Sequence, residues 1–236
     1  MYQAHFDLHT HTISSGHGST DTLTDLAKAA SAKGLHALGI SDHGPATPGS
    51  AKESYFRNLP ISSRAKFGVS LFYGVELNIL NGQGDVDLPA SILSHLDYAI
   101  VSMHLPTFKV LSKEENTLSY IRAMRHLKVR FLGHIDDGRY PIDFLTVLTA
   151  AKECNIYPEI NNRSLMPEAY RTDGHQNCKT ILEICKKLDL PVLLSSDSHG
   201  KDHVGDFSYI YPLLASVDFP ERLVLNSDIH FLNQIL

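Results

Sequence analysis

Residues 7–11 read Asp-Leu-His-Thr-His and end a short apolar run that starts at residue 5. Side chains two positions apart on a β-strand share one face of the sheet, so His9 and His11 can hold one metal ion between them. A single His-x-His pair also occurs by chance, so on its own it is weak evidence for a metal site. Its meaning depends on what the rest of the chain places beside it.

Seven apolar runs, the first of them at residues 5–8, are each short enough to form a buried strand. The other six are residues 35–40, 70–77, 98–102, 130–133, 157–160 and 191–195. Apolar residues at helical spacing lie between the runs, within residues 23–30, 118–124, 144–151 and 181–188. Thr22 with Asp25 predicts a capping box at the start of the first helix. Strands that alternate with helices indicate a parallel sheet, and we predict an α/β fold with a seven-stranded barrel.

Length and composition fit a single domain over residues 1–236. Hydrophobic residues make up 43% of the chain and charged residues 20%, as in an ordinary globular protein. Residues 44–66 and 167–174 are irregular, with Pro, Ser and Gly, and we expect loops there over one barrel face. We see neither a secretory leader nor a run of about 20 apolar residues, so we expect a cytoplasmic protein.

Cysteine usage and charge exclude some classes of function. Cys154, Cys178 and Cys185 form no C-x-x-C pair, and we interpret them as structural thiols. The formal net charge of -5 disfavours a broad basic surface for nucleic acid. This charge does not exclude a nucleotide as the substrate.

The later strands end in further residues of the kind that bind metals. These are His43, Glu76, His104, His134, Asp197 and His199, and His17 lies in the loop after the first strand. A lone histidine beside a strand is more often a hydrogen-bonded core or surface residue. The C-terminal ends of barrel strands meet at one rim, however, and chance does not readily place a whole set there. We therefore predict a metal centre at this rim.

The remaining seven histidines have no such recurring position in the chain. They are His5, His36, His95, His126, His175, His203 and His230. We interpret them as structural or solvated, with His126 on a helix. His175 and His203 are the two that long loops of the catalytic face can bring near a substrate.

The predicted ligands indicate the chemistry. Imidazole together with carboxylate suits zinc, manganese or iron. Nine ligands are too many for one four-coordinate ion and match two or three ions that share a bridging carboxylate. Such a centre lowers the pKa of a bound water and neutralises the charge of a phosphoryl group under attack. The sequence therefore predicts hydrolysis of a phosphate ester.

Seven motifs together resemble the polymerase and histidinol phosphatase (PHP) superfamily, and most of all its YcdX-like stand-alone phosphatases. They are DLHTHT (7–12), ISDHGP (40–45), GVELN (74–78), SMH (102–104), GHID (133–136), EINNRS (159–164) and SSDSHG (195–200). The resemblance runs from about residue 6 to the C-terminus. It implies a distorted (β/α)7 TIM-like barrel, the PHP fold, with a trinuclear metal site.

The resemblance also implies a ligand for each position of that site: His9, His11 and Asp197 for one ion, Glu76 as the bridge to a second ion held by His104 and His134, and His17, His43 and His199 for the third. It implies three divalent ions, zinc before manganese or iron, and attack by a metal-bridging hydroxide. Asp42 is expected to orient water or ligands. The segment TISSGHGSTDT between His11 and the first helix is slightly longer than the family pattern, which puts the pocket rim in doubt.

The substrate we predict is a small phosphorylated molecule, with Arg163 and Arg64 as the candidate partners of its phosphate. There are two enzyme alternatives: a phosphodiesterase or exonuclease, and a histidinol-phosphate phosphatase. The net negative charge of the chain disfavours the phosphodiesterase or exonuclease. A metal-binding assembly module is the alternative without turnover. The sequence does not decide whether the protein forms homo-oligomers or which compound is its natural substrate.

Overall fold

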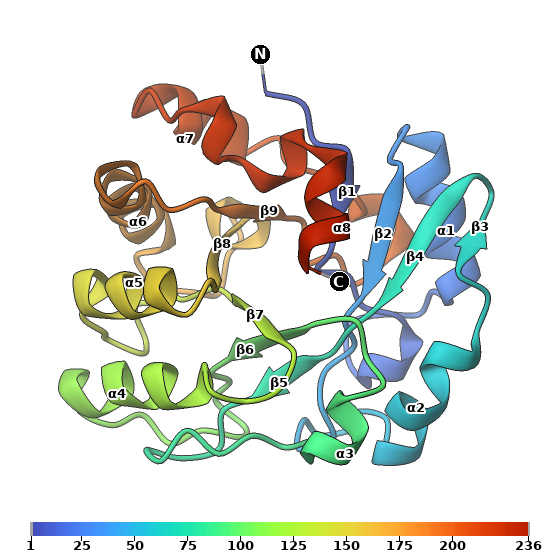
Figure 1. Cartoon of the computed structure of the whole chain (residues 1–236), viewed down its shortest axis with the longest axis horizontal. Helices are drawn as coiled ribbons and strands as arrows, with labels where there is room; N and C mark the ends of the chain where they lie inside the picture. Colours follow the sequence, from blue (N-terminus) through green and yellow to red (C-terminus); the bar gives the residue numbers. More distant parts are fainter. Residues whose placement is uncertain (1, 236) are drawn as a thin grey trace.

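Short parallel strands form the centre of the fold, and helices cover them on the outside (Figure 1). The computed structural model describes residues 2–235. One sheet has the order β1-β2-β4-β3 and the other the order β5-β6-β7-β8-β9. The strands are β1 (Phe6–Asp7), β2 (Ala37–Ile40), β3 (Ala65–Lys66), β4 (Val69–Tyr73), β5 (Glu76–Asn78), β6 (Ala99–Ser102), β7 (Val129–Leu132), β8 (Tyr157–Asn161) and β9 (Leu193–Ser195). All of these strands pair in parallel except β3 with β4.

The two sheets follow one another around a distorted ring. The chain passes from β4 to β5 within two residues, and a parallel bridge between His43 and Glu76 continues the pairing beyond β2. At the other edge a parallel bridge joins Thr10 to Ser198, just after β1 and β9. Because β4 and β5 share one place in the ring and the antiparallel β3 is an additional edge strand beside β4, the parallel strands occupy seven positions, the number that the sequence predicted.

Tyr98 lies where the predicted strand over residues 70–77 divides into β4 and β5. A Cβ atom at Gly74 would lie 2.5 Å from the Tyr98 ring, and one at Gly39 would lie 2.1 Å from its hydroxyl oxygen. The hydroxyl donates a hydrogen bond of 2.5 Å to the carbonyl oxygen of Leu8. Only glycine leaves room at these two positions for a buried ring that ties β1 to the start of β6.

One apolar cluster fills the interior of the ring. It contains Phe6, Leu8, Ala37, Tyr98, Ile100, Phe131 and Leu193 from the strands, and Leu225, Phe231 and Leu232 from the C-terminal segment. Two further clusters lie between the strands and the helices. The C-terminal segment therefore packs against the interior cluster and leaves the opposite, carboxyl ends of the strands for other residues.

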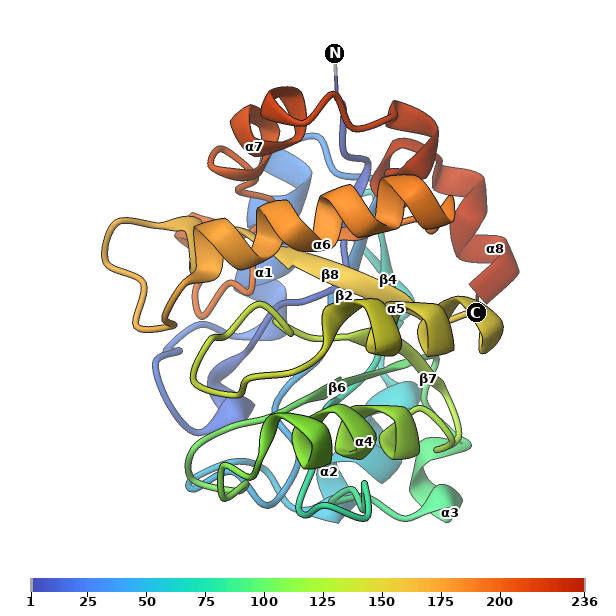
Figure 2. The ribbon, with the colours of Figure 1, turned by 90° about the vertical axis from the view of Figure 1, so that its left-hand side faces the viewer.

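The helices cover the outside of the strands, and α4, α5 and α6 lie side by side on one flank (Figure 2). The α-helices are α1 (Leu23–Ala32), α2 (Glu53–Asn58), α3 (Ala90–Leu93), α4 (Lys113–Ala123), α5 (Phe144–Glu153), α6 (Gly174–Leu188), α7 (Ile210–Ser216) and α8 (Leu232–Ile235). Short 3-10 helices are η1 (Ile13–Ser15), η2 (Leu59–Ile61), η3 (Asn162–Leu165), η4 (Lys201–His203), η5 (Glu221–Leu223), η6 (Leu225–Ser227) and η7 (Ile229–Phe231). Within residues 2–235, no helix has the length and apolar character that a bilayer span requires.

The four predicted helices are present as α1, α4, α5 and α6, and the capping box of Thr22 with Asp25 is confirmed. Two predictions were wrong. Residues 44–66 contain α2 and β3 as well as loop, because α2 buries only Phe56 and so shows no apolar periodicity. His126 lies in a turn after the end of α4, and its Nε2 atom contacts the carbonyl oxygen of Gly84 at 2.8 Å.

Asn226, in η6, makes hydrogen bonds to both β1 and β9, the two strands whose extensions are joined by the bridge between Thr10 and Ser198. Its side-chain nitrogen donates to the carbonyl oxygens of Phe6, at 2.8 Å, and of Leu194, at 2.9 Å. Its side-chain oxygen accepts the backbone N–H of Leu194 at 2.7 Å. The buried amide thus provides β1 and β9 with hydrogen bonds that a regular ladder would otherwise supply.

Replacing Asn226 by leucine should lower the free energy of unfolding by about 2–4 kcal/mol, because it leaves buried backbone groups unpaired. Urea denaturation measures this change. Asn58→Ala is the matched control, since the Asn58 amide makes an exposed hydrogen bond within α2. That control should change the free energy by no more than about 0.5 kcal/mol. Equal stability of the two variants would contradict a bridging role for Asn226.

Candidate metal centre

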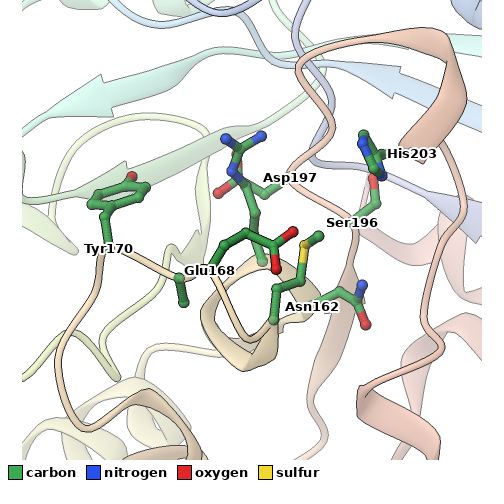
Figure 3. A pocket seen from close by; sticks show the side chains of 9 residues that line it. Asn162, Glu168, Tyr170, Ser196, Asp197 and His203 are labelled. Carbon is green, nitrogen blue, oxygen red and sulfur yellow. The ribbon is translucent and has the colours of Figure 1, made fainter.

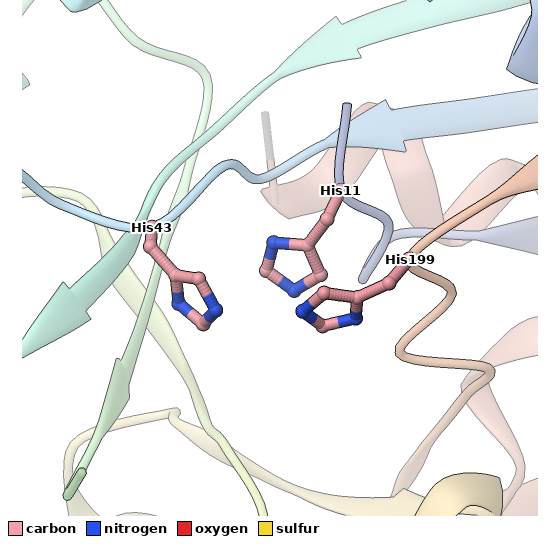
Figure 4. Close-up of side chains that lie close together, drawn as sticks. All are labelled: His11, His43 and His199. Atoms are coloured by element: carbon pink, nitrogen blue, oxygen red, sulfur yellow. The ribbon is translucent and has the colours of Figure 1, made fainter. Parts of the chain in front are cut away.

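The nine predicted ligands come together at the carboxyl ends of the strands. Figure 4 shows His11, His43 and His199 with their rings directed toward one another from three separate segments. The centroid of the His11 ring lies 4.4 Å from that of His43 and 4.2 Å from that of His199. Strand ends far apart in the sequence therefore deliver imidazoles to one place.

The carboxylate of Glu76, at the start of β5, lies in the middle of this group. Its Oε2 atom is 2.6 Å from Nδ1 of His43, 3.4 Å from Nε2 of His9 and 3.6 Å from Nε2 of His11. Two ligands of one tetrahedral ion lie about 3.3–3.6 Å apart when each bond is about 2.0–2.2 Å long. The pairs with His9 and His11 have this separation.

The other oxygen of Glu76 faces a different pair of histidines. Its Oε1 atom is 2.9 Å from Nε2 of His134 and 3.2 Å from Nε2 of His104. The two Nε2 atoms are themselves 3.2 Å apart. Each oxygen of one carboxylate thus has its own set of imidazole nitrogens, which is the arrangement that a bridge between two ions requires.

Asp197 follows β9 and adds a second carboxylate. Its Oδ1 atom lies 3.3 Å from Nε2 of His11, 3.5 Å from Nδ1 of His199 and 3.8 Å from Nε2 of His9. The backbone at Asp197 has φ of 50°, and at His134 it has φ of 27°. Such left-handed values are costly for these residues and are concentrated at functional sites.

His17 is the most exposed of the nine. It lies on the loop after η1, and its ring centroid is 4.8 Å from that of His43 and 5.2 Å from that of His199. The structure therefore brings His17 to the edge of the group. The longer segment before α1 does not move it away.

Residues behind the centre orient the histidines. Nδ1 of His9 lies 2.5 Å from Oε1 of Glu159, whose Oε2 accepts the backbone N–H of His134 at 2.6 Å. Nδ1 of His104 lies 2.8 Å from the side-chain oxygen of Asn78. A hydrogen bond from Nδ1 leaves Nε2 free to bind a metal, as outer carboxylates and amides do in metal sites.

Asp42 lies behind His11 and not among the converging atoms. Its carboxylate accepts hydrogen bonds from the backbone N–H and hydroxyl of Thr12, at 2.7 and 2.8 Å, and from the hydroxyl of Tyr55 at 2.5 Å. The Ser15 hydroxyl donates to Asp42 at 2.7 Å and lies 2.9 Å from Nδ1 of His11. Asp42 therefore reaches His11 through Ser15.

Charge within the centre favours the ligand forms of most side chains. Burial opposes ionisation of Glu76, but His43 and His104 outweigh it and hold the Glu76 pKa well below its usual value. Burial lowers the pKa of His104 and of His199 to about 4, so both are neutral at pH 7. Burial also lowers the pKa of His9, but Glu159 and Glu76 outweigh it and raise that pKa well above its usual value.

The donor atoms fit a cluster of divalent cations. Within the described part of the chain, Nε2 of His9, Nε2 of His11 and Oε2 of Glu76 are buried and make no hydrogen bond, because the short contact of Oε2 with Nδ1 of His43 lacks hydrogen-bond geometry. Buried polar atoms without partners are rare in proteins, and a cation would satisfy all three. Three groups have ligand atoms within 4.8 Å of one another: His9, His11 and Glu76; His43, Glu76 and His104; and His11, His43 and His199. The groups share members, as expected of a centre with more than one ion.

Two cavities open beside this centre. One, of about 550 Å³, is lined by His17, His43, His104, His134, His199, Thr47, Pro48, Leu105, Pro106, Arg139, Arg163 and Tyr170, with Gly18. The other, of about 120 Å³, is lined by Asn162, Arg163, Met166, Glu168, Ala169, Tyr170, Ser196, Asp197 and His203 (Figure 3). Arg163 and Tyr170 belong to both linings, so they lie where the two cavities approach each other.

The structure separates the two predicted phosphate-binding arginines. Arg163 lines both cavities. Arg64 lines neither, because its half-exposed guanidinium pairs with Asp97 and lies over the ring of Tyr73, 4.9 Å from its centroid. The expectation for Arg64 is therefore corrected. Of the two uncertain histidines, His203 lines the smaller cavity, whereas His175 is exposed at the start of α6.

Sequence reasoning missed four residues near the centre: Glu159, Arg139, Tyr170 and Arg171. Glu159 carried a signal, because it is a charged residue within an apolar run that forms the buried strand β8. Arg139, Tyr170 and Arg171 lie outside the strands and helices, where no periodic pattern exists to place a side chain.

Comparison with known proteins agrees with this geometry. The family model described as PHP domain matches residues 7–162. A Clostridium acetobutylicum protein named "Probable phosphatase" is 42% identical over 222 residues, which cover 94% of this chain and 90% of that protein.

Two solved structures share the fold. A Listeria monocytogenes structure named for histidinol phosphatase has a TM-score of 0.67 and 18% identity, covering 87% of this chain and 99% of that one. The histidinol phosphate phosphatase of Lactococcus lactis, complexed with zinc, L-histidinol and phosphate, has a TM-score of 0.63 and 17% identity, covering 92% of this chain and 95% of that one. By the family match and the close relative, the chain belongs to the PHP domain family.

Proposed function

We propose that this protein is a metal-dependent phosphomonoesterase with a centre for three divalent ions, zinc before manganese or iron. The observation that carries the proposal is the set of buried, unpartnered ligand atoms of His9, His11 and Glu76. They lie beside a cavity lined by further imidazoles and by the guanidinium of Arg163. The names of the curated relatives, which call them probable phosphatases, support the same reaction class.

The proposed division of ligands follows the two faces of Glu76. His9, His11 and Asp197 would hold one ion on the Oε2 side, and His104 and His134 would hold a second on the Oε1 side. His17, His43 and His199 would hold the third. When bound, such ions activate water for attack on phosphorus and neutralise the charge that develops on the phosphoryl oxygens.

Arg163 is the side chain we propose for binding the substrate phosphate. The guanidinium of Arg139, which lines the same cavity, is already held by Asp137, with Nε–oxygen distances of 2.9 and 3.0 Å. Arg163 is therefore the cation better able to turn to an incoming phosphate, for which a guanidinium offers two parallel hydrogen bonds. A cavity of about 550 Å³ suits a small phosphorylated molecule.

Hydrolysis of p-nitrophenyl phosphate should depend on bound metal. We expect turnover by the purified protein, loss of turnover after chelation, and recovery on adding zinc, manganese or iron(II), with the best ion identifying the preferred metal. Parallel assays with histidinol phosphate and with single-stranded DNA test the two enzyme alternatives. Bound metal without hydrolysis of any ester would contradict the proposal and favour a metal-binding assembly module.

Changing Glu76 to alanine should lower kcat/KM by about 1,000-fold or more, because the shared carboxylate of the centre is lost. Elemental analysis should show fewer ions per chain, while circular dichroism shows a folded protein. His126→Ala is the matched control, since His126 contacts the carbonyl oxygen of Gly84 and lines neither cavity. Full turnover by the Glu76 variant would exclude the proposed centre.

Changing Arg163 to alanine should lower kcat/KM for a monoester by roughly 10–100-fold, because a charge-assisted contact to phosphate is lost. Metal content should not change. Arg64→Ala is the control, as it removes a guanidinium that pairs with Asp97. If both variants keep the activity of the unaltered protein, Arg163 does not bind the phosphate.

A further inference from the structure

Arg171 is a cation in an unusual setting. It lies in the irregular segment between η3 and α6, yet only 7% of it is exposed. Among residues 2–233, whose burial the structure describes, no other Arg or Lys is buried. A buried guanidinium is costly to desolvate, so its partners indicate what it does.

The partners of Arg171 determine which oxygen of Asp197 faces the centre. Nη2 of Arg171 donates to Oδ2 of Asp197 at 2.7 Å, and the side-chain nitrogen of Asn161 donates to the same oxygen at 3.1 Å. Nη1 of Arg171 donates to the hydroxyl of Ser164 at 3.0 Å. Oδ2 of Asp197 is therefore occupied, and only Oδ1 is directed at His11, 3.3 Å away.

We propose that Arg171 is a positioning residue that makes Asp197 a one-oxygen metal ligand. The proposal rests on the function proposed above, because it concerns the ion that His9, His11 and Asp197 would share. Arg171 lies on the far side of the carboxylate from His11, so it acts through Asp197 and does not touch the substrate.

Two further observations support this role. Asp197 has a left-handed backbone, with φ of 50°, which a side chain fixed from behind helps to maintain. Burial disfavours the charged form of Asp197, but Arg171 and His9 outweigh it and hold the Asp197 pKa well below its usual value. Arg171 thus supplies both direction and charge to the carboxylate.

Arg139 provides a matched comparison within the same surface. The guanidinium carbons of Arg139 and Arg171 lie 4.9 and 5.2 Å from the centroid of the Tyr170 ring. Each arginine also pairs with an aspartate, but Asp137, the partner of Arg139, is not among the converging ligands. A change at Arg139 therefore removes the same kind of contact without affecting Asp197.

The test compares zinc binding in the unaltered protein and in the Arg171→Gln, Arg171→Lys and Arg139→Lys variants. Zinc-loaded protein is titrated with a chromogenic zinc chelator, zinc per chain is measured by elemental analysis, and circular dichroism reports folding. In Arg171→Gln we expect one ion to be released with an affinity weakened roughly 10–100-fold, while the others stay bound. Lysine keeps the positive charge of Arg171 but lacks its planar set of hydrogen-bond donors, so the loss of zinc affinity in Arg171→Lys should be smaller than in Arg171→Gln. Arg139→Lys should match the unaltered protein within about twofold.

The proposal is overturned if the folded Arg171 variants release zinc along the same curve as the unaltered protein. A purely structural role for Arg171 predicts that result, even if the thermal stability of the variants falls. If Arg171→Gln does not fold, Arg171→Lys decides alone. Failure of the proposed function looks different: the unaltered protein itself would then hold no stoichiometric zinc, or would hold it without hydrolysing any phosphate ester.

Discussion

The carboxylate of Glu76 is removed from water and enclosed by five imidazoles, and the rest of the structure is arranged around it. A buried carboxylate is stable only when opposite charge and hydrogen bonds compensate for its lost hydration. Here the imidazoles come from the ends of four strands, with His9 and His11 both following β1, so the partners assemble only when the strands do. Binding of the ions would therefore also stabilise the folded chain, as in other metal sites that exist only in the folded state.

The two ends of the strand ring carry different tasks. At the amino ends, the C-terminal segment packs on the interior apolar cluster, and Asn226 joins β1 to β9. At the carboxyl ends, polar side chains replace apolar ones and face the cavities. This separation is common to α/β barrels, in which one face provides stability and the other provides the site.

Much of the fold could be predicted because the strands are buried on both faces, so they read as short apolar runs. The convergence of the ligands followed from the shared direction of parallel strands. The division of residues 70–77 into β4 and β5 could not be predicted, since the Tyr98 ring beside Gly74 is a contact between distant residues. Arg64 and Arg171 show the same limit: a loop arginine acquires its role from a partner, Asp97 or Asp197, that sequence spacing does not reveal.

The central claim is that these strand ends form one centre for several metal ions. Anomalous diffraction from crystals of the purified protein, recorded on both sides of the zinc absorption edge, tests it most directly. The account predicts three strong peaks, one within bonding distance of each proposed ligand set: His9, His11 and Asp197; Glu76, His104 and His134; and His17, His43 and His199. Peaks confined to other parts of the surface, in crystals grown with zinc, would contradict it.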